Sequence, residues 1–201
     1  MNIAIRLAKK QDMREVAEVH EACFEGYFST KLGKKILEKY YGAYLEKFPE
    51  LFVVACDTDK NKIIGLTNGY VVGTNVTNEF VKKNIIIMAL RVMWLLIKFD
   101  KVAWKKVFGM IKKEKPSKEA PKVKDGSGDL LSICVIDEYK GCGAAQHMIE
   151  KFEEELKKLK IEEYFLSVFS DNARARKFYE KCGFGIYFET EKEIKYIKKL
   201  K

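Results

Sequence analysis

The sequence lacks the features that would assign it at once to several large classes of protein. Its five cysteines are an odd number and include no pair at C-x-x-C spacing, so we expect neither a zinc site nor a complete disulfide framework. Residues 2–7 alternate as in a strand, whereas a secretory signal needs a charged region, an apolar run and a cleavage site. These absences favour a reduced, cytoplasmic setting, and we expect no bound metal.

A long apolar run is also missing. The most apolar segment, residues 85–99, has only 15 residues and is interrupted by Arg91 and Lys98. A membrane-spanning helix needs about 20 consecutive apolar residues. We therefore expect no transmembrane helix in this chain. No segment repeats at a fixed period, so a single domain over residues 1–201 is the simplest organisation.

What the sequence does contain is an alternation of strand and helix patterns. Apolar runs predict strands at 2–8, 51–56, 63–72, 130–135, 163–169, 184–189 and 193–198, and amphipathic periodicity predicts helices at 10–24, 34–47, 143–160 and 172–182. The turn residues at 57–62 should join an antiparallel hairpin, whereas the strand–helix–strand unit at 130–169 requires a parallel pair. The predicted fold class is therefore α/β, with one mixed, twisted sheet flanked by helices.

Positive charge is concentrated in one segment. The formal net charge is +9, and residues 80–125 alone hold 13 Lys or Arg against 4 Asp or Glu, an excess of nine. We interpret this segment as a helical insert before the strand at 130–135, with a mobile Lys- and Pro-rich loop from residue 115. Trp94 and Trp104 with their flanking lysines fit a lid, a homodimer face or a helix at a membrane surface. Nucleic acid is the least favoured partner, because the excess charge belongs to the insert alone.

The most informative part of the chain begins with the apolar strand at 131–135. Lys140-Gly-Cys-Gly-Ala-Ala145 follows it and opens a predicted helix. Glycines at a helix N-terminus let backbone N–H groups approach a phosphate, and the helix dipole and the Lys140 ammonium add positive charge. Taken alone, Gly141 and Gly143 could equally form a tight structural turn.

A second motif gives this turn a specific meaning. Asn172 opens a helix that contains Ala175 and ends in Phe178-Tyr-Glu-Lys-Cys-Gly-Phe184. In this order and separation, the two motifs resemble the cofactor half of the GNAT (GCN5-related N-acetyltransferase) family over residues 128–188. Lys140 stands where the family usually has Arg or Gln, and lysine offers a phosphate a point charge rather than a fork. The resemblance implies an enzyme that moves an acetyl group from its co-substrate acetyl-CoA to an amine.

The resemblance also implies which residues contact acetyl-CoA. In the family, the pantetheine arm lies between the two parallel strands, and a backbone N–H near Ile133 or Cys134 polarises the thioester carbonyl. The implied cofactor-binding residues are Ile133, Cys134, Val135, Lys140, Gly141, Cys142, Gly143, Ala144, Ala145 and Asn172. Tyr179 matches the family tyrosine that protonates the departing thiolate, and its alternative role is that of a core tyrosine.

The sequence does not name the base that takes the proton of the acceptor amine. Asp129 and Glu25 are the candidate carboxylates, and a chain of water molecules is an alternative. His20 and His147 are better explained as packing or surface residues. A covalent route through Cys134 or Cys142 is disfavoured, because neither has a neighbouring histidine in the sequence to activate a thiolate.

The acceptor is defined only through the resemblance. Tyr27 and Phe28 lie where the family places an acceptor-lining loop, although they could equally form an apolar plug between helices. The pattern at 27–33 and the long insert resemble a GNAT subgroup linked to bacterial surface sugars. We therefore expect direct transfer to the primary amine of a small molecule, with an amino-sugar as the first candidate. The alternatives are a protein or peptide amine, or a non-catalytic acyl-CoA-binding module with a membrane-binding insert.

Overall fold

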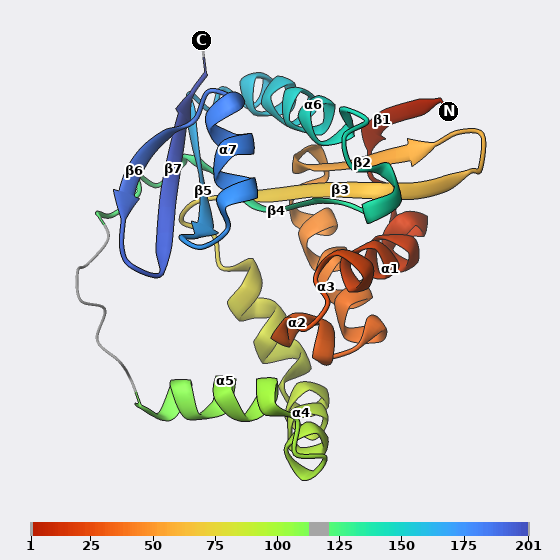
Figure 1. The fold of residues 1–201 in the computed structure, drawn as a ribbon, viewed down its shortest axis with the longest axis vertical. Coiled ribbons are helices and arrows are strands. Elements are labelled where there is room, and N and C mark those ends of the chain that lie inside the picture. The colour runs from red at the N-terminus through yellow and green to blue at the C-terminus, as the bar shows by residue number, and fades with distance from the viewer. Residues whose placement is uncertain (1, 113–120, 201) are drawn as a thin grey trace.

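The computed structural model describes residues 2–112 and 121–200, in which strands and helices alternate as predicted (Figure 1). The strands are β1 (Ile3–Leu7), β2 (Phe52–Asp57), β3 (Lys62–Val71), β4 (Gly128–Val135), β5 (Glu163–Phe169), β6 (Gly185–Glu189) and β7 (Glu193–Lys199). The α-helices are α1 (Met13–Cys23), α2 (Phe28–Lys31), α3 (Lys34–Lys47), α4 (Val76–Ile97), α5 (Lys101–Lys112), α6 (Ala144–Lys158) and α7 (Ala173–Lys181). Short 3-10 helices lie at Lys10–Asp12, Pro49–Leu51 and Asp137–Tyr139.

The strands form one mixed sheet, which confirms the predicted fold class. Its seven strands lie in the order β1-β2-β3-β4-β5-β7-β6. The β2–β3 hairpin is antiparallel, and β4 and β5 form the parallel pair that the strand–helix–strand unit requires. The crossover helix of that unit is α6. The sheet therefore brings the two sequence motifs together at its centre.

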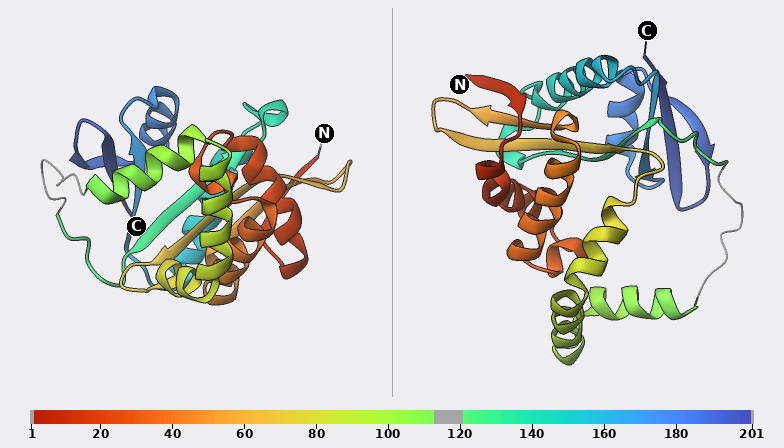
Figure 2. Two further views of the ribbon diagram at one scale, coloured as in Figure 1. Left: turned by 90° about the horizontal axis from the view of Figure 1, so that it is seen from below. Right: turned by 180° about the vertical axis from the view of Figure 1, so that it is seen from behind.

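Helices cover the sheet on both faces. In Figures 1 and 2, α6 lies on one face with α7 beside it, while α1 and α3 lie on the other. α6 buries Met148, Phe152 and Leu156, which recur at helical spacing. A side chain at Gly69 of β3 would place its Cβ against the Asp129 carbonyl oxygen and 2.6 Å from the Phe152 ring, so β4 and α6 together require glycine there.

The predicted helical insert corresponds to α4 and α5, which connect β3 to β4. α4 begins at Val76, four residues before the predicted start of the insert. Its first turns are tied to α3, because the Tyr44 hydroxyl lies 2.6 Å from Thr77 Oγ1 and the Phe80 ring packs against Tyr40. No helix in the described parts of the chain is long and apolar enough to cross a membrane. Residues 113–120, which hold much of the predicted mobile loop, lie outside the described residues.

One element was not predicted. The segment at 25–30, expected to break the helical pattern, contains the start of α2, which is only four residues long. A single helical turn has no periodicity for sequence analysis to detect. Its position matters, because α2 packs against both α3 and α5.

Candidate active site

The central feature of the sheet is a gap that opens between its two parallel strands. β4 and β5 pair only over residues 128–130 and 164–166. Beyond that point β4 is bonded to β3 alone as far as Val135, and β5 is bonded to β7 alone as far as Phe169. Backbone N–H and C=O groups on the facing edges therefore have no strand partner across the gap. An extended ligand could bond to these edges as an added strand.

A β-bulge marks the start of the gap. The pairing of β3 with β4 passes from Ser132 directly to Leu130 and leaves Leu131 without a partner. A bulge adds one residue to a strand and bends it locally. The predicted pantetheine contacts at 133–135 lie directly after this bend, on the part of β4 that diverges from β5.

The glycine turn follows the diverging end of β4. Gly141 and Gly143 have φ angles of +88° and +85°, a left-handed conformation that strains residues with side chains. Gly143 precedes the first turn of α6, where backbone N–H groups have no partner within the helix. Lys140 forms an ion pair with Asp137 in the same turn. Exposed amides, the positive end of a helix and a lysine fit the pyrophosphate of acetyl-CoA.

Three of the remaining predicted cofactor residues lie in or next to the same turn, and the fourth, Asn172, immediately precedes α7. Ala144 is buried and Cys142 and Ala145 are partly buried, so their backbones rather than their side chains face a ligand. Asn172 caps α7, because its Oδ1 accepts a hydrogen bond of 3.1 Å from the Ala175 N–H. The cap fixes the start of the helix that carries Tyr179.

Tyr179 lies on α7 and its phenol faces β4. Burial raises the pKa of Tyr179, with smaller contributions from Cys182 and from Cys134 of β4. The ring packs against Phe184 and Tyr196, at centroid distances of 5.7 and 6.1 Å. The phenol therefore stays protonated at neutral pH and is held close to the strand where the thioester is expected.

The other face of the sheet carries a hydrogen-bonded chain that the sequence did not predict. His20 Nδ1 lies 2.7 Å from the Tyr41 hydroxyl, and His20 Nε2 lies 3.1 Å from Ser29 Oγ. Burial raises the pKa of Tyr41, and the nearby Ser132 of β4 opposes that rise. Burial lowers the pKa of His20 to about 4, so the ring is neutral at pH 7. The chain links α3 to α2 through residues far apart in the sequence.

Asp129, a predicted candidate base, lies two residues before the bulge. It pairs with Tyr70 of β3, whose ring contacts Tyr44, so both face α3. Burial raises the pKa of the Asp129 carboxyl to about 6, while Lys195 opposes the shift and Glu193 adds to it. A carboxyl with this pKa is ionised at neutral pH and still accepts a proton readily.

Buried polar side chains without hydrogen-bond partners lie next to Ser132 in the described structure. Asn68 pairs with Ser132 across the strands and is fully buried. Within the described residues, neither Nδ2 nor Oδ1 of Asn68 has a hydrogen-bond partner, and the same holds for Thr67 Oγ1. An unpaired buried amide costs about 1–3 kcal/mol. A water molecule or a polar group of a substrate beside the bulge would remove that cost.

Of the predicted acceptor-lining residues, Tyr27 contacts the end of β5. The Tyr27 ring is 6.4 Å from that of Phe169, the last residue of β5, whereas Glu25 is exposed in the turn before α2. Phe28 and α5 border a cavity of about 410 Å³. The cavity is lined by Phe28, Val102, Lys105, Lys106 and Gly109. The insert therefore contributes apolar and positively charged groups to this cavity beside α2.

Two cysteines meet at the gap. Cys23, at the end of α1, lies beside Cys134, and this contact lowers the pKa of Cys23. The same contact, together with burial, raises the pKa of the Cys134 thiol. A thiol with a raised pKa is a poor nucleophile, so Cys134 is unsuited to a covalent acetyl intermediate.

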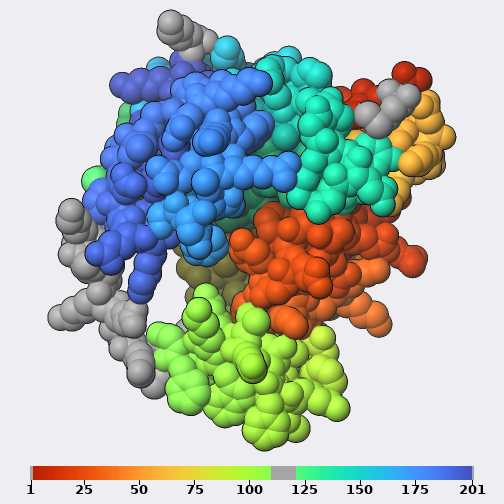
Figure 3. Space-filling view, in the orientation of Figure 1, coloured from red at the N-terminus to blue at the C-terminus, as the bar shows by residue number. Residues whose placement is uncertain are grey.

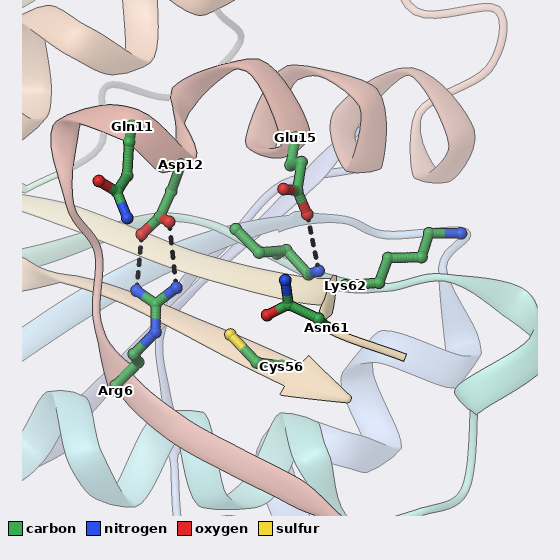
Figure 4. Close-up of a pocket in the computed structure, with 8 residues that line it drawn as sticks. Arg6, Gln11, Asp12, Glu15, Cys56, Asn61 and Lys62 are labelled. Carbon is green, nitrogen blue, oxygen red and sulfur yellow. Dashed lines mark hydrogen bonds and ion pairs between the residues drawn. The ribbon is translucent and has the colours of Figure 1, made fainter. Parts of the chain in front are cut away.

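A second polar pocket lies at the β1–β2 edge of the sheet, away from the gap (Figure 4). Three of its four charged side chains bond within the protein. Asp12 accepts hydrogen bonds of 2.6 and 3.0 Å from the two guanidinium nitrogens of Arg6, and Glu15 accepts one of 3.0 Å from the Ile63 N–H. Although burial opposes it, the Arg6 hydrogen bond keeps the pKa of Asp12 below its usual value. These bonds tie the start of α1 to β1 and β3, so both carboxylates of the pocket are already engaged.

Comparison with known proteins agrees with this geometry. The sequence pattern of the "Acetyltransferase (GNAT) family" matches residues 13–184. No curated protein matches the chain. Among solved structures, PH1933 from Pyrococcus horikoshii OT3 is 18% identical with a TM-score of 0.64, covering 100% of this chain and 99% of that one.

Two further structures share the fold. The PaiA N-acetyltransferase from Thermoplasma acidophilum, solved in complex with coenzyme A, is 17% identical with a TM-score of 0.56, and 99% of each chain is covered. The ribosomal-protein-S18-alanine N-acetyltransferase from Escherichia coli is 14% identical with a TM-score of 0.59, covering 99% of this chain and 94% of that one. The split parallel strands, the glycine turn and the family match together show that the chain belongs to the GNAT family of acetyl-CoA-dependent N-acetyltransferases.

Proposed function

We propose that this enzyme transfers the acetyl group directly from acetyl-CoA to the primary amine of a small, negatively charged molecule. The observation that carries the acetyl-transfer step is the gap between β4 and β5 after Leu130, with the glycine turn at its end and Tyr179 beside it. The observation that points to the acceptor is the lysine-lined cavity between α2 and α5.

The donor would lie along β4. Ile133, Cys134 and Val135 would bond the pantetheine arm through their backbone groups, and an N–H at 133 or 134 would polarise the thioester carbonyl. Such an oxyanion contact contributes about 2.7–4 kcal/mol to transition-state stabilisation. The pyrophosphate would bind the amides of the turn, and Lys140 would exchange Asp137 for a phosphate as its partner.

The acetyl group can pass directly from acetyl-CoA to the amine without a covalent enzyme intermediate. The neutral amine attacks the thioester carbonyl carbon, the C–N bond forms, and the C–S bond breaks. The Tyr179 phenol gives its proton to the departing thiolate, and the Asp129 carboxylate takes the proton that the amine loses. Tyr41, His20 and Ser29, which are joined by hydrogen bonds, would offer the acceptor a polar surface beside β4.

The cavity chemistry favours an acceptor with an apolar or sugar face and a phosphate. Phe28 and Val102 provide an apolar wall, and Lys105 and Lys106 provide two positive charges. An amino-sugar carrying a phosphate or nucleoside diphosphate has both properties. Lysine binds phosphate as a point charge, so this cavity would select charge more strongly than shape.

A protein or peptide amine is the second candidate. The similar solved structures include the ribosomal-protein-S18-alanine N-acetyltransferase and the NatC complex bound to Gag peptide and CoA. At 14% and 16% identity these similarities speak for the fold alone. The lysines at the cavity would then favour acidic peptides.

An acceptor screen separates the two. CoA release is measured with nucleoside-diphosphate amino-sugars, the same amino-sugars without phosphate, and peptides with a free N-terminus. We expect the phosphate-bearing sugars to be the best substrates, and Lys105→Glu/Lys106→Glu to raise their KM about tenfold while the KM of neutral amines is unchanged. Release only with peptides would replace the small-molecule proposal by the second candidate, and no release with any amine would refute both.

A further inference from the structure

The outer side of α4 is apolar and exposed. Ile86, Leu90, Met93 and Ile97 recur at spacings of four, three and four residues, so they form one stripe along the helix. Their exposed fractions are 73%, 56%, 52% and 67%. Ile87 and Trp94 border the stripe and are also exposed. The helix belongs to the insert, drawn in green, which projects from the body of the molecule in Figure 3.

The stripe carries no charge, because the one charged residue in its length is turned inward. Arg91 donates a hydrogen bond of 3.1 Å from Nε to the Lys31 carbonyl, and its guanidinium lies 4.7 Å from the Trp94 ring. Phe80 and Leu95 are buried on the inner side of the helix. α4 is thus fastened to the protein by one face and presents the other to its surroundings.

The turn after α4 extends this surface. Phe99 is 81% exposed and has a φ of +55°, a conformation that strains a bulky residue. Asp100 holds the turn, since its Oδ1 accepts hydrogen bonds of 3.0 Å from the Val102 and Ala103 N–H groups and its Oδ2 pairs with Lys31 at 3.2 Å. The strained, hydrogen-bonded turn therefore keeps the large apolar side chain of Phe99 exposed to solvent. Such strain is typical of residues that bind a partner.

Positive charge surrounds the apolar surface. Lys82 and Lys83 precede the stripe, and Lys98 and Lys101 follow it, all four exposed. Within residues 80–112 the one acidic side chain is Asp100, which is already engaged by Lys31 and by the start of α5. In the part of the chain that the structure describes, no acidic side chain forms an ion pair with these four lysines, so a partner that covers the stripe meets positive charge at both ends of the stripe.

We propose that the outer face of α4, with Phe99 and the four surrounding lysines, is a docking surface for an anionic lipid bilayer. An apolar helix face bordered by lysine and tryptophan is suited to the boundary between headgroups and acyl chains. Lysines near an anionic surface add attraction that falls with rising salt. A second copy of the chain would bring the same lysines against each other, so like-charge repulsion opposes a dimer through this face. The helix lies in the plane of the surface, since no described helix is suited to crossing it.

Vesicle sedimentation tests the proposal on the full chain, whatever the acceptor proves to be. Phosphatidylcholine vesicles with and without phosphatidylglycerol are compared at low and high salt. We expect binding to the phosphatidylglycerol vesicles, weakened by salt, and an at least tenfold loss of apparent affinity in Leu90→Glu/Ile97→Glu. The matched control is Leu159→Glu/Ile186→Glu, which adds two carboxylates at positions 41% and 52% exposed outside the insert. It should bind as the wild type does, apart from the small effect of net charge.

Three results would overturn the proposal. The first is no binding of the wild type to either vesicle. The second is binding that Lys82→Glu/Lys83→Glu abolishes and Leu90→Glu/Ile97→Glu leaves unchanged, because that pattern is charge attraction without apolar contact. The third is a dimer, detected by sedimentation velocity, that dissociates in Leu90→Glu/Ile97→Glu, while the wild type does not bind vesicles.

Tryptophan emission tests the contact without altering the stripe. The chain has two tryptophans, and Trp104 is held by a hydrogen bond of 3.1 Å from its Nε1 to the Leu96 carbonyl. Trp104→Phe leaves Trp94 as the sole reporter, and phospholipid brominated on its acyl chains should quench that emission strongly. Quenching no greater than that of Trp104 in a Trp94→Phe variant would contradict insertion of the α4 face.

Discussion

The donor side of the active site consists mainly of backbone groups, whereas the proposed acceptor side consists mainly of side chains. On the donor side, β4, the glycine turn and α6 offer mainly backbone groups, and the side chains between them are small or absent. On the proposed acceptor side, α1, α2, α3 and α5 offer side chains such as His20, Tyr41 and Lys105. A backbone site recognises a cofactor that is the same in every relative, whereas side chains can be exchanged as the acceptor changes. The acceptor side should therefore tolerate substitution with a change of specificity, and the donor side should not.

The largest expected effect is on the donor side. Gly143→Asp should lower the affinity for acetyl-CoA about 1,000-fold, because an aspartate at a φ of +85° strains the turn and places a carboxylate beside the pyrophosphate. Calorimetry measures the affinity. Gly185→Asp is the matched control, since a Cβ there meets nothing within 4 Å and its φ is not left-handed. Equal affinities in the two variants would show that the turn does not hold the cofactor.

The second prediction separates binding from chemistry on the same side. Tyr179→Phe should lower kcat about 100-fold and leave acetyl-CoA affinity close to that of the wild type, because the phenol acts on the thiolate that develops in the transition state. Tyr196→Phe is the matched control. It removes another phenol next to Tyr179, one that donates to Glu180 rather than to the gap. Unchanged turnover in Tyr179→Phe would assign this tyrosine to the core alone.

This contrast also explains what the sequence could and could not predict. A turn of exposed backbone needs glycines at fixed places and a capped helix after it, so Gly143 and Asn172 mark the donor side in the sequence itself. The parallel pair and its crossover follow from the same strand–helix–strand order. The split of the pair, however, depends on the skipped residue Leu131, and a bulge leaves no mark on the apolar pattern.

The acceptor side could not be predicted for a different reason. His20 meets Tyr41 and Ser29, and Cys23 meets Cys134, through packing of separate elements rather than through any local pattern. His20 was accordingly interpreted as a packing residue, and its buried contacts are compatible with that. α4 was recognised as apolar and short of a membrane span, but its 22 residues include polar first turns that carry no helical periodicity.

The third prediction moves to the acceptor side. If Asp129 is the base, kcat/KM should fall as the pH drops below about 6, where the carboxyl gains a proton. Asp129→Asn should lose this limb of the profile and about tenfold in kcat/KM at pH 8. The measurement is kcat/KM from pH 5 to 9, and a profile unchanged by the substitution would exclude Asp129 as the base.

Asp129→Asn should increase the stability of the fold, although it should lower the activity. The folded pKa of about 6 exceeds the unfolded value near 4, so the native state binds the proton more tightly. The ionised carboxylate therefore destabilises the fold above pH 6, and this penalty disappears as the pH falls through 4. Asp129→Asn should raise the free energy of unfolding by roughly 2 kcal/mol at pH 8 and leave it nearly unchanged at pH 4. Lower stability at pH 8 would mean that the carboxylate is a structural partner.

The smallest expected effect is on stability, when the hydrogen bond between Tyr41 and His20 is removed. Tyr41→Phe removes the hydroxyl that bonds to His20 and leaves a buried ring nitrogen unpaired, so it should cost about 1–2 kcal/mol of unfolding free energy. Tyr44→Phe is the matched control, because its partner Thr77 is exposed and can bond to water instead. We expect less than about 1 kcal/mol there. Denaturant unfolding measures both, and equal losses would mean that the chain has no stabilising role of its own. Tyr41→Phe could instead show a larger loss of stability, a raised KM for the acceptor and an unchanged affinity for acetyl-CoA. That result would assign the Tyr41–His20–Ser29 hydrogen bonds to acceptor binding alone, as the proposed division between a donor side and an acceptor side requires.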